Sequence, residues 1–455
     1  MSTDLFAIRE CLDGGIPAVV ATCAPDGTPN ITYVSQVHLV DARHVALSFQ
    51  FFNKTRQNVL ANPQATTFVI HPETGARYRL HLRYLRTESE GPLFESMKAR
   101  LAGIASHSGM TGVFRLRGSD IYAVESVEAV GDAPTRPERY KRLLPRVREA
   151  SAPLTQANTM AALFEALLEA LETRLEIHHA MLLLCDRARS RLFLVASRGY
   201  ATSGVGSEIP YGAGVIGVAA QQRVPIRINY SAAEYAYGRA MRDSALARGL
   251  ADPLETAIPF PGLAEPGSQM AVPVLLGDDV LGLVYVESAG EGRFNHDDED
   301  ALVCLAGTLA WAIRALEDDA DGDDAAPRAQ PARPSLQHAP QSTQPADAVP
   351  LLVRRYARDN SVFLDDDYLI KGVAGAILWR LLQAYTQEGR VDFSNRELRR
   401  DPAIGLPEVT DNLEARLILL AKRLAERGGA LRLEKTGRGR LRLHVGRRLA
   451  LLESP

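Results

Sequence analysis

A strongly acidic and proline-rich segment constrains this sequence most, because it divides the chain into parts that must fold separately. It begins with EDDADGDD at 317–324, where six of eight residues are acidic, and it continues to Pro350 with six prolines and no aromatic residue. Such a stretch buries too little apolar surface to offset the entropy that ordering would cost. We therefore predict a disordered linker over 317–350.

The remaining sequence is too long for one ordinary core and predicts three folded units. A polar, proline-punctuated stretch at 131–154 predicts a second linker, which leaves units at 1–130, 155–316 and 351–455. With 46% apolar and 24% charged residues, the composition is that of a soluble globular protein. The amino-terminal residues lack the apolar core of a signal peptide, and no run reaches the roughly 20 apolar residues of a membrane span. We expect a cytoplasmic protein without membrane contact.

The cysteines and histidines predict no metal site. Cys11, Cys23, Cys185 and Cys304 lie far apart in the sequence and form no CxxC pair. This spacing argues against both a disulfide scaffold and a zinc site, and it fits a reducing compartment. The adjacent histidines at 178–179 stand at the start of a strand pattern, where packing or solvation is the common role.

Many short strand patterns and few helices characterise the first unit, which favours a closed or split β-barrel. Strands are predicted at 17–24, 29–41, 44–49, 65–71, 77–89 and 120–130. TRQNVLANP at 55–63 predicts a short helix that Thr55 caps. Lys54, Thr55 and Arg56 at its start allow two interpretations. They either cap a helix and carry solvated charge, or they bind an anion together with the N–H groups of the first turn.

The order of these segments resembles a known family. GIPAVVATCAPDGTPNITYVSQV, then HVALSFQFFNKTRQNVLANPQATTFVI, is similar to the pyridoxamine 5′-phosphate oxidase-like family of FMN-binding split barrels. The resemblance implies FMN at a dimer interface, with its phosphate at the strand-to-helix step and its ring near the preceding strand. It also implies the chemistry of an FMN-dependent oxidoreductase, although no second basic cluster predicts vitamin B6 as the substrate. The residues that it suggests for FMN are Lys54, Thr55, Arg56, Ser35 and Gln36.

The middle unit combines amphipathic helices with apolar strands, which predicts an α+β fold. The helix pattern at 158–177 places leucines at i, i+4 steps, and 296–316 predicts a closing helix with an acidic start. MAVPVLLGDDVLGLVYVES at 270–288 predicts an apolar hairpin. The glycines at 212, 214 and 217 have GxGxxG spacing, but they lack the strand–helix context and distal acid of a dinucleotide site.

This unit resembles a GAF domain. The similar segments are IPYGAGVIGVAAQQRVPIRIN at 209–229 and the whole stretch at 268–313. The resemblance implies either a small-molecule ligand between the sheet and a variable cap, or a domain that only dimerises. The cap would begin at 230. Its candidate pocket residues, which alternatively only pack the cap, are Tyr230, Tyr235, Tyr237 and Arg239.

The third unit is the basic part of the chain, with 20 Lys and Arg residues against 14 Asp and Glu residues. The sequence predicts a helix at 369–389, a helix capped by Ser394 with Glu397 three residues on, and a long helix that ends at Gly428-Gly429. Alternating apolar and charged residues at 430–445 predict a hairpin.

Three helices followed by a basic hairpin resemble the winged helix-turn-helix of bacterial transcription regulators, such as the C-terminal domain of response regulators. The resemblance implies double-stranded DNA as a partner, with the helix at 409–427 in the major groove and the hairpin on phosphates. A solvated basic face or a protein-binding surface is the alternative. The candidate DNA contacts are Asn412, Arg416, Arg423, Lys435, Arg438 and Arg440.

Taken together, the sequence predicts a multidomain protein in which a split β-barrel, an α+β GAF domain and a small winged helix are joined by linkers. The function that fits this order is a homodimeric regulator that senses redox state or a small ligand and controls a DNA-binding output. The alternatives are an FMN-dependent oxidoreductase with a regulatory GAF domain and a protein-interaction tail, or a scaffold that only mediates association.

Overall fold

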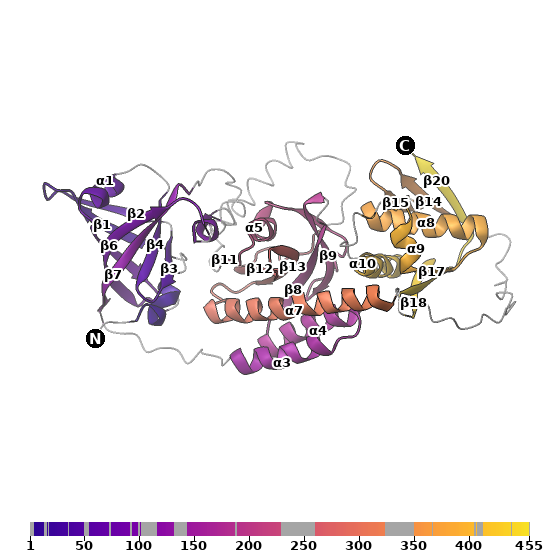
Figure 1. The fold of residues 1–455 in the computed structure, drawn as a ribbon, viewed down its shortest axis with the longest axis horizontal. Coiled ribbons are helices and arrows are strands. Elements are labelled where there is room, and N and C mark those ends of the chain that lie inside the picture. The colour runs from indigo at the N-terminus through magenta and orange to yellow at the C-terminus, as the bar shows by residue number, and fades with distance from the viewer. Residues whose placement is uncertain are drawn as a thin grey trace.

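The structure is a computed structural model of the chain, and Figure 1 shows three folded units in a row. They are called here the barrel unit (4–131), the middle unit (143–323) and the C-terminal unit (350–454). The residues that the structure describes are 4–12, 16, 18–34, 36–49, 54–71, 74–91, 93–98, 101, 116–131, 143–186, 189–228, 260–323, 350–365, 367–404, 406, 413–437 and 439–454.

Seven antiparallel strands form the barrel unit, in the order β2-β1-β5-β6-β7-β4-β3. Their core includes Val20, Leu80 and Leu82, and the unpredicted 3-10 helix η1 (Leu5–Leu12) adds Leu5 and Ile8 to it. The predicted strands and the short helix of this unit are present, except that the predicted strand 29–41 is two strands, β2 and β3, at opposite edges of the sheet. The elements are β1 (Ala18–Cys23), β2 (Pro29–Val34), β3 (Val37–Asp41), β4 (His44–Phe49), α1 (Lys54–Ala61), β5 (Gln64–Ile70), β6 (Arg77–Glu88) and β7 (Gly118–Val130).

A six-stranded antiparallel sheet forms the middle unit, in the order β10-β9-β8-β13-β12-β11. Helices α3, α4 and α7 pack on one face of it, and α5 packs on the other. The predicted leucine stripe of α4 is buried from Leu163 to Leu175. The elements are α3 (Leu143–Gln156), α4 (Met160–Leu175), β8 (His179–Asp186), β9 (Arg191–Arg198), β10 (Glu208–Pro210), α5 (Gly214–Gln222), β11 (Ile226–Ile228), β12 (Ser268–Leu276), β13 (Asp279–Ser288) and α7 (His296–Asp323).

Parts of both predicted linkers are helical in the structure and belong to the middle unit. Helix α3 starts at Leu143, inside the stretch 131–154, and its Ala150 and Leu154 are buried in the core because an apolar side of this polar helix faces α4 and α7. Helix α7 continues to Asp323, seven residues beyond the predicted end at 316. Residues 324–349 lie outside the described residues, so the disordered linker stays a prediction.

The C-terminal unit contains the helices and the hairpin that the sequence predicted. Helix α10 begins at Leu413, and the Ser394 hydroxyl caps α9 by accepting from the Glu397 N–H. Three helices pack beside the antiparallel sheet β17-β19-β18. These elements are α8 (Gly372–Glu388), β17 (Asp392–Ser394), α9 (Asn395–Arg400), α10 (Leu413–Glu426), β18 (Leu431–Gly437) and β19 (Arg440–Val445).

A second sheet in this unit, in the order β16-β15-β14-β20, was not predicted. Its strand β20 runs parallel to β14, with Leu351 opposite Leu449, and so joins the two ends of the unit. Its strands are β14 (Leu351–Tyr356), β15 (Ser361–Leu364), β16 (Asp367–Ile370) and β20 (Leu449–Ser454).

The middle and C-terminal units share one buried apolar cluster. It contains Phe193 and Val195 of β9 together with Leu419 and Leu420 of α10. The two units are therefore packed against each other rather than only connected by chain. All four cysteines are free thiols. Among the described residues, no helix is both long and apolar enough to cross a membrane.

We expect Thr159→Ala to loosen the start of α4, because the Thr159 hydroxyl accepts from the Ala162 N–H at 3.2 Å and caps the helix. Loss of such a cap costs about 1 kcal/mol. Hydrogen exchange followed by mass spectrometry should show first-turn amides of α4 exchanging about fivefold faster. Thr159→Ser keeps the acceptor and should match the wild type; equal exchange in the Ala variant would contradict the assigned cap.

Candidate functional site

Helix α1 follows β4 in the barrel unit, and two of the predicted phosphate ligands, Lys54 and Thr55, stand at its start. Lys54 makes no ion pair with another described residue. Lys54 is exposed, and the Thr55 hydroxyl accepts from Asn30 Nδ2 at 2.8 Å. The same Asn30 amide lies 3.4 Å from Thr22 Oγ1 on β1, so β1 and β2 hold the first turn of α1. Thr55 keeps its own proton to donate, and the first N–H groups of a helix have no partner within it. This end of α1 therefore offers donors to an anion.

Arg56, the third predicted phosphate ligand, is engaged by an acid. Its Nη1 donates to Asp120 Oδ1 at 2.6 Å and to Thr87 Oγ1 at 3.1 Å. The guanidinium carbon lies 4.2 Å from the ring centroid of Phe49. The side chains of Arg56 and Asp120 are 19% and 9% exposed, so the pair is shielded and nearly neutral as a unit. Arg56 thus braces α1 against β7, while Lys54 and Thr55 present donors to a ligand.

Gln36, the predicted neighbour of a flavin ring, carries an unsatisfied polar atom. Its side chain is buried, and its Oε1 has no hydrogen-bond partner among the described residues. The same holds for the hydroxyls of Ser48 and Ser119, which face each other across β4 and β7. Buried polar atoms without a hydrogen-bond partner cost stability unless a ligand or a water molecule forms the hydrogen bond. These atoms and the donors at α1 fit a polar, phosphate-bearing group. Ser35 lies outside the described residues.

The middle unit contains a pocket of about 580 Å³ between its sheet and residues 260–266. Its walls are mostly apolar, with Ile209, Val215 and Phe260 among them. Of the described residues that line it, Glu287 alone is charged. The four predicted ligand residues, Tyr230, Tyr235, Tyr237 and Arg239, lie outside the described residues and so remain predictions.

Glu287 is buried on β13, with an exposed fraction of 3%. Its Oε1 accepts from the Leu263 N–H at 2.8 Å, and its Oε2 accepts from the Tyr285 hydroxyl at 3.1 Å. Burial raises the pKa of this carboxyl above its ordinary value, and the Leu263 N–H and the Tyr200 and Tyr285 hydroxyls only partly oppose the rise. A carboxylate held this way is suited to a ligand that brings a cation or a hydrogen-bond donor.

The structure corrects two of the predicted DNA contacts on α10. Arg416 is 4% exposed and donates to Asp186 Oδ2 of the middle unit at 2.8 Å. Arg423 is 7% exposed and donates to the carbonyl of Leu369 at 3.1 Å. Both side chains point into packed interfaces, so neither is accessible to DNA in this arrangement.

The remaining DNA candidates lie on the hairpin or outside the described residues. Lys435 and Arg440 are exposed on β18 and β19, and Lys435 makes an ion pair with Glu414. Asn412 and Arg438 lie outside the part of the chain that the structure describes.

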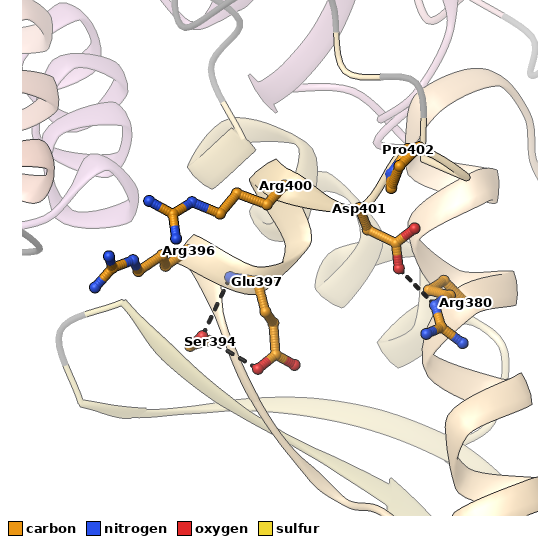
Figure 2. A pocket seen from close by; sticks show the side chains of 7 residues that line it. All are labelled: Arg380, Ser394, Arg396, Glu397, Arg400, Asp401 and Pro402. Atoms are coloured by element: carbon orange, nitrogen blue, oxygen red, sulfur yellow. Dashed lines mark hydrogen bonds and ion pairs between the residues drawn. The ribbon is translucent and has the colours of Figure 1, made fainter.

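A basic surface that the sequence analysis missed lies on α9. Residues of α9 line a shallow hollow of about 520 Å³. In Figure 2, the side chains of Arg396 and Arg400 point to the same side. On the other side of the hollow, Arg380 donates to Asp401 at 2.5 Å. Neither Arg396 nor Arg400 makes an ion pair with another described residue. The signal was present in the sequence, since residues four apart on a helix share a face.

The strand β19 adds a cation to this surface. Arg440 pairs with Ser394 across β17 and β19, and the Asn395 N–H donates to the carbonyl of Gly439 at 2.8 Å. The start of α9 and the hairpin are therefore one contiguous basic region, which we call the α9–hairpin surface (Arg396, Arg400 and Arg440). Among the described residues, no group of three or more His, Cys, Asp or Glu side chains is arranged for a metal ion.

We expect Glu287→Gln to stabilise the middle unit at neutral pH. The pKa of the Glu287 carboxyl is higher in the folded than in the unfolded protein. The stability that its protonated form contributes is therefore present at low pH, and it is lost as the pH rises through the folded-state pKa. Gln keeps an acceptor for the Leu263 N–H without a buried charge. Thermal unfolding should place the variant a few degrees above the wild type at about pH 7 and level with it at about pH 4.

Glu291→Gln is the matched control for that measurement, because it removes the same charge from an exposed turn. It should leave the unfolding temperature unchanged at both pH values. A Glu287→Gln variant that melts below the wild type at about pH 7 would show that the carboxylate is charged and stabilising there.

Comparison with known families assigns the first two units. Residues 6–125 match the family model described as pyridoxamine 5′-phosphate oxidase, and residues 157–314 match the GAF domain. No curated protein matches the chain. Because each family covers its own part of the sequence, the chain joins an oxidase-type barrel to a GAF domain and then to the C-terminal unit.

Solved structures resemble single units of the chain. The GAF domain of a phosphoenolpyruvate-protein phosphotransferase from Acinetobacter is 17% identical and covers 39% of this chain and 96% of its own, with a TM-score of 0.31. An FMN-binding protein from Syntrophomonas wolfei is 15% identical and covers 28% and 87%, with a TM-score of 0.25. HupZ from group A Streptococcus is 22% identical and covers 30% and 100%, with a TM-score of 0.23. The two family-model matches alone place a pyridoxamine 5′-phosphate oxidase-like domain at 6–125 and a GAF domain at 157–314.

Proposed function

We propose that this protein is a cytoplasmic signal-sensing regulator, in which the barrel and the GAF domain control a winged-helix output that binds double-stranded DNA. The observation that carries the proposal is the element order of the C-terminal unit. Helices α8, α9 and α10 are followed by the β18–β19 hairpin, and β19 pairs back onto β17. Three helices with a hairpin beside the third are the parts of a winged helix-turn-helix.

The α9–hairpin surface supports a nucleic-acid partner for this unit. Arg396 and Arg400 are exposed and free of acidic partners among the described residues, and Arg440 lies beside them. Guanidinium groups on one face make favourable contacts with successive backbone phosphates. Phosphate contacts of this kind position a protein on the duplex, and they leave base recognition to the next helix, α10.

FMN is the cofactor that the barrel unit favours. Lys54 and Thr55, with the first turn of α1, would hold its phosphate, and Arg56 would keep that turn in place through Asp120. Gln36 would meet a polar edge of the ring. When bound, FMN supplies reversible redox chemistry, which suits either a redox sensor or an oxidoreductase.

The GAF pocket favours a small ligand with an apolar body and one cationic or hydrogen-bond-donating group. The walls are apolar, and Glu287 is the charged group in the described lining. A ligand ammonium or amidinium would pair with this carboxylate, which burial otherwise disfavours in its charged form.

Apolar side chains exposed on the edge strand β2 support a homodimer. Ile31 and Tyr33 are 71% and 78% exposed, and Leu60 on the adjoining α1 is 61% exposed. Large apolar side chains grouped on an open sheet edge favour pairing with another chain. A second copy of the barrel unit would cover them beside the proposed flavin site, and a dimer would present two winged helices to paired half-sites.

We expect the full-length protein to bind duplex DNA with a steep salt dependence. Each phosphate-binding cation that a substitution removes reduces the slope of log K against log salt by about 0.9. Fluorescence anisotropy with a labelled duplex should therefore give a slope shallower by about 2 for Arg396→Ala/Arg400→Ala. Arg83→Ala/Arg86→Ala removes two exposed cations from the barrel unit and should leave the slope unchanged. Equal slopes in all three proteins would contradict the assigned surface.

We expect the purified protein to carry flavin absorbance, and Lys54→Ala/Thr55→Val to lose it while the barrel stays folded. Arg56→Ala is the wrong probe, because it strands the Asp120 carboxylate beside β4. Lys98→Ala, another exposed lysine of the unit, should retain flavin. If the double variant binds flavin undiminished, Lys54 and Thr55 do not hold the flavin phosphate. Oxidation of a reduced nicotinamide without any DNA binding would favour the alternative function, an FMN-dependent oxidoreductase.

A further inference from the structure

Helix α10 is covered along almost its whole length. Within Leu413–Glu426, only Ala425 and Glu426 are exposed. One side of the helix packs on α8, β16 and β18 of its own unit, and the other packs on α4 and β9 of the middle unit. Figure 1 shows α10 between β9 and the rest of the C-terminal unit. A helix that enters the major groove needs an exposed face, so in this arrangement α10 has none to offer.

A buried ion pair closes the contact between α10 and the middle unit. Arg416 Nη2 donates to Asp186 Oδ2 at 2.8 Å, and the two side chains are 5% and 7% exposed. The Arg416 guanidinium also lies 3.8 Å from the ring centroid of Phe193 on β9. Asp186 Oδ1 accepts from the Arg189 N–H, which fixes the carboxylate at the end of β8. Because neither charge is hydrated, each depends on the other.

Further polar contacts surround this pair on the same interface. Lys422 Nζ donates to the carbonyl of Val195 at 3.4 Å, and the Ser203 hydroxyl bonds to Glu426. At the start of α8, Lys371 Nζ lies 3.6 Å from Glu208 Oε2. The contacts come from both ends of α10 and from α8, so the C-terminal unit is held in one orientation.

We propose that this docked α10 is an autoinhibitory contact, in which the surface of the GAF domain around Asp186 and Phe193 competes with duplex DNA for the same helix. The inference rests on the proposed DNA-binding function and adds its regulation. With α10 docked, the α9–hairpin surface stays free for phosphates, which gives weak binding that does not depend on sequence. Release of α10 exposes Arg416 and its neighbours and permits base contacts.

The sheet of the GAF domain connects this contact to the ligand pocket. Along β9, Leu192 and Leu194 belong to the core on the pocket side, whereas Phe193 and Val195 belong to the core that contains α10. Successive side chains of a strand point to opposite faces, so β9 contributes to both cores. Its Leu192 pairs with Ile209 of β10, which lines the pocket. A ligand that shifts β10 and β9 would therefore move Phe193, on which the Arg416 guanidinium lies.

The test is Asp186→Asn in the full-length protein, which keeps the size of the side chain and removes the negative charge to which Arg416 Nη2 donates across the interface. Hydrogen exchange of α10 amides should rise at least about tenfold, and affinity for a labelled duplex should rise by about the same factor. Asp278→Asn, a fully exposed acid in the β12–β13 turn, is the matched control and should change neither quantity. Unchanged exchange of α10 in Asp186→Asn would overturn the proposal.

Two further variants keep the proposal testable if Asp186→Asn folds poorly. Asp186→Asn/Arg416→Met removes both charges and should restore slow exchange of α10, because an apolar side chain of similar length then packs in the interface in place of the ion pair. Lys371→Ala/Ser203→Ala removes only rim contacts and should raise exchange and DNA affinity two- to threefold, roughly, in the same direction. Faster exchange without any gain in DNA affinity would overturn the autoinhibitory role. If the wild-type salt slope also shows no dependence on Arg396 and Arg400, the DNA-binding function itself fails.

Discussion

The ion pair of Arg416 with Asp186 sets the arrangement of the middle and C-terminal units. Moving either charge out of water costs several kcal/mol, and the mutual attraction offsets that cost only while the pair is intact. A buried pair is therefore a poor source of stability but a strict geometric requirement. It permits one docking of α10 on β8 and β9, since any other orientation strands a charge in the apolar cluster around Phe193.

This requirement explains why α10 carries basic residues on a side that is not solvated. Arg416 meets an acid, and Arg423 meets the carbonyl of Leu369 and the carboxylate of Glu426. Lys422 reaches a backbone carbonyl, and burial lowers the pKa of its amino group despite the nearby carboxylates of Glu165 and Glu426. The cations of this helix are used for contacts within the protein, whereas Arg396 and Arg400 of α9 are exposed and make no ion pair with another described residue.

Sequence periodicity predicted most elements, because each depends on local pattern. The stripe Leu163, Leu167, Leu171 and Leu175 is buried as expected, and the alternation of the β18–β19 hairpin holds. The misses depend on contacts between distant segments. The parallel pairing of β14 with β20 joins residues about a hundred positions apart, which no local pattern signals.

In the candidate sites, too, local pattern predicted single residues, whereas their partners come from distant segments. A helix wheel places Arg416 on the same side as Leu413 and Leu420, since it lies three residues after the first and four before the second. The Asp186 carboxylate that pairs with Arg416 there comes from the middle unit, which no pattern within α10 signals. Asp120 likewise comes from β7 to meet Arg56, far from the Lys-Thr-Arg triplet that predicted the phosphate site. Glu287 and Asp186 are each an acid at the end of an apolar strand, a pattern that marks both as unusual. That pattern does not tell which of them faces a pocket and which faces a helix.

The interface between the barrel and middle units is weaker than the interface between the middle and C-terminal units. The barrel unit meets the middle unit through Arg9 and the acidic start of α7, where Arg9 and Asp297 are 23% and 31% exposed. Pairs this accessible contribute at most about 1 kcal/mol and weaken with salt. The middle and C-terminal units instead share a continuous apolar core with a buried pair. The proposed coupling of the GAF pocket to α10 would therefore act through packed side chains, whereas a change in the barrel would reach α7 through these accessible pairs.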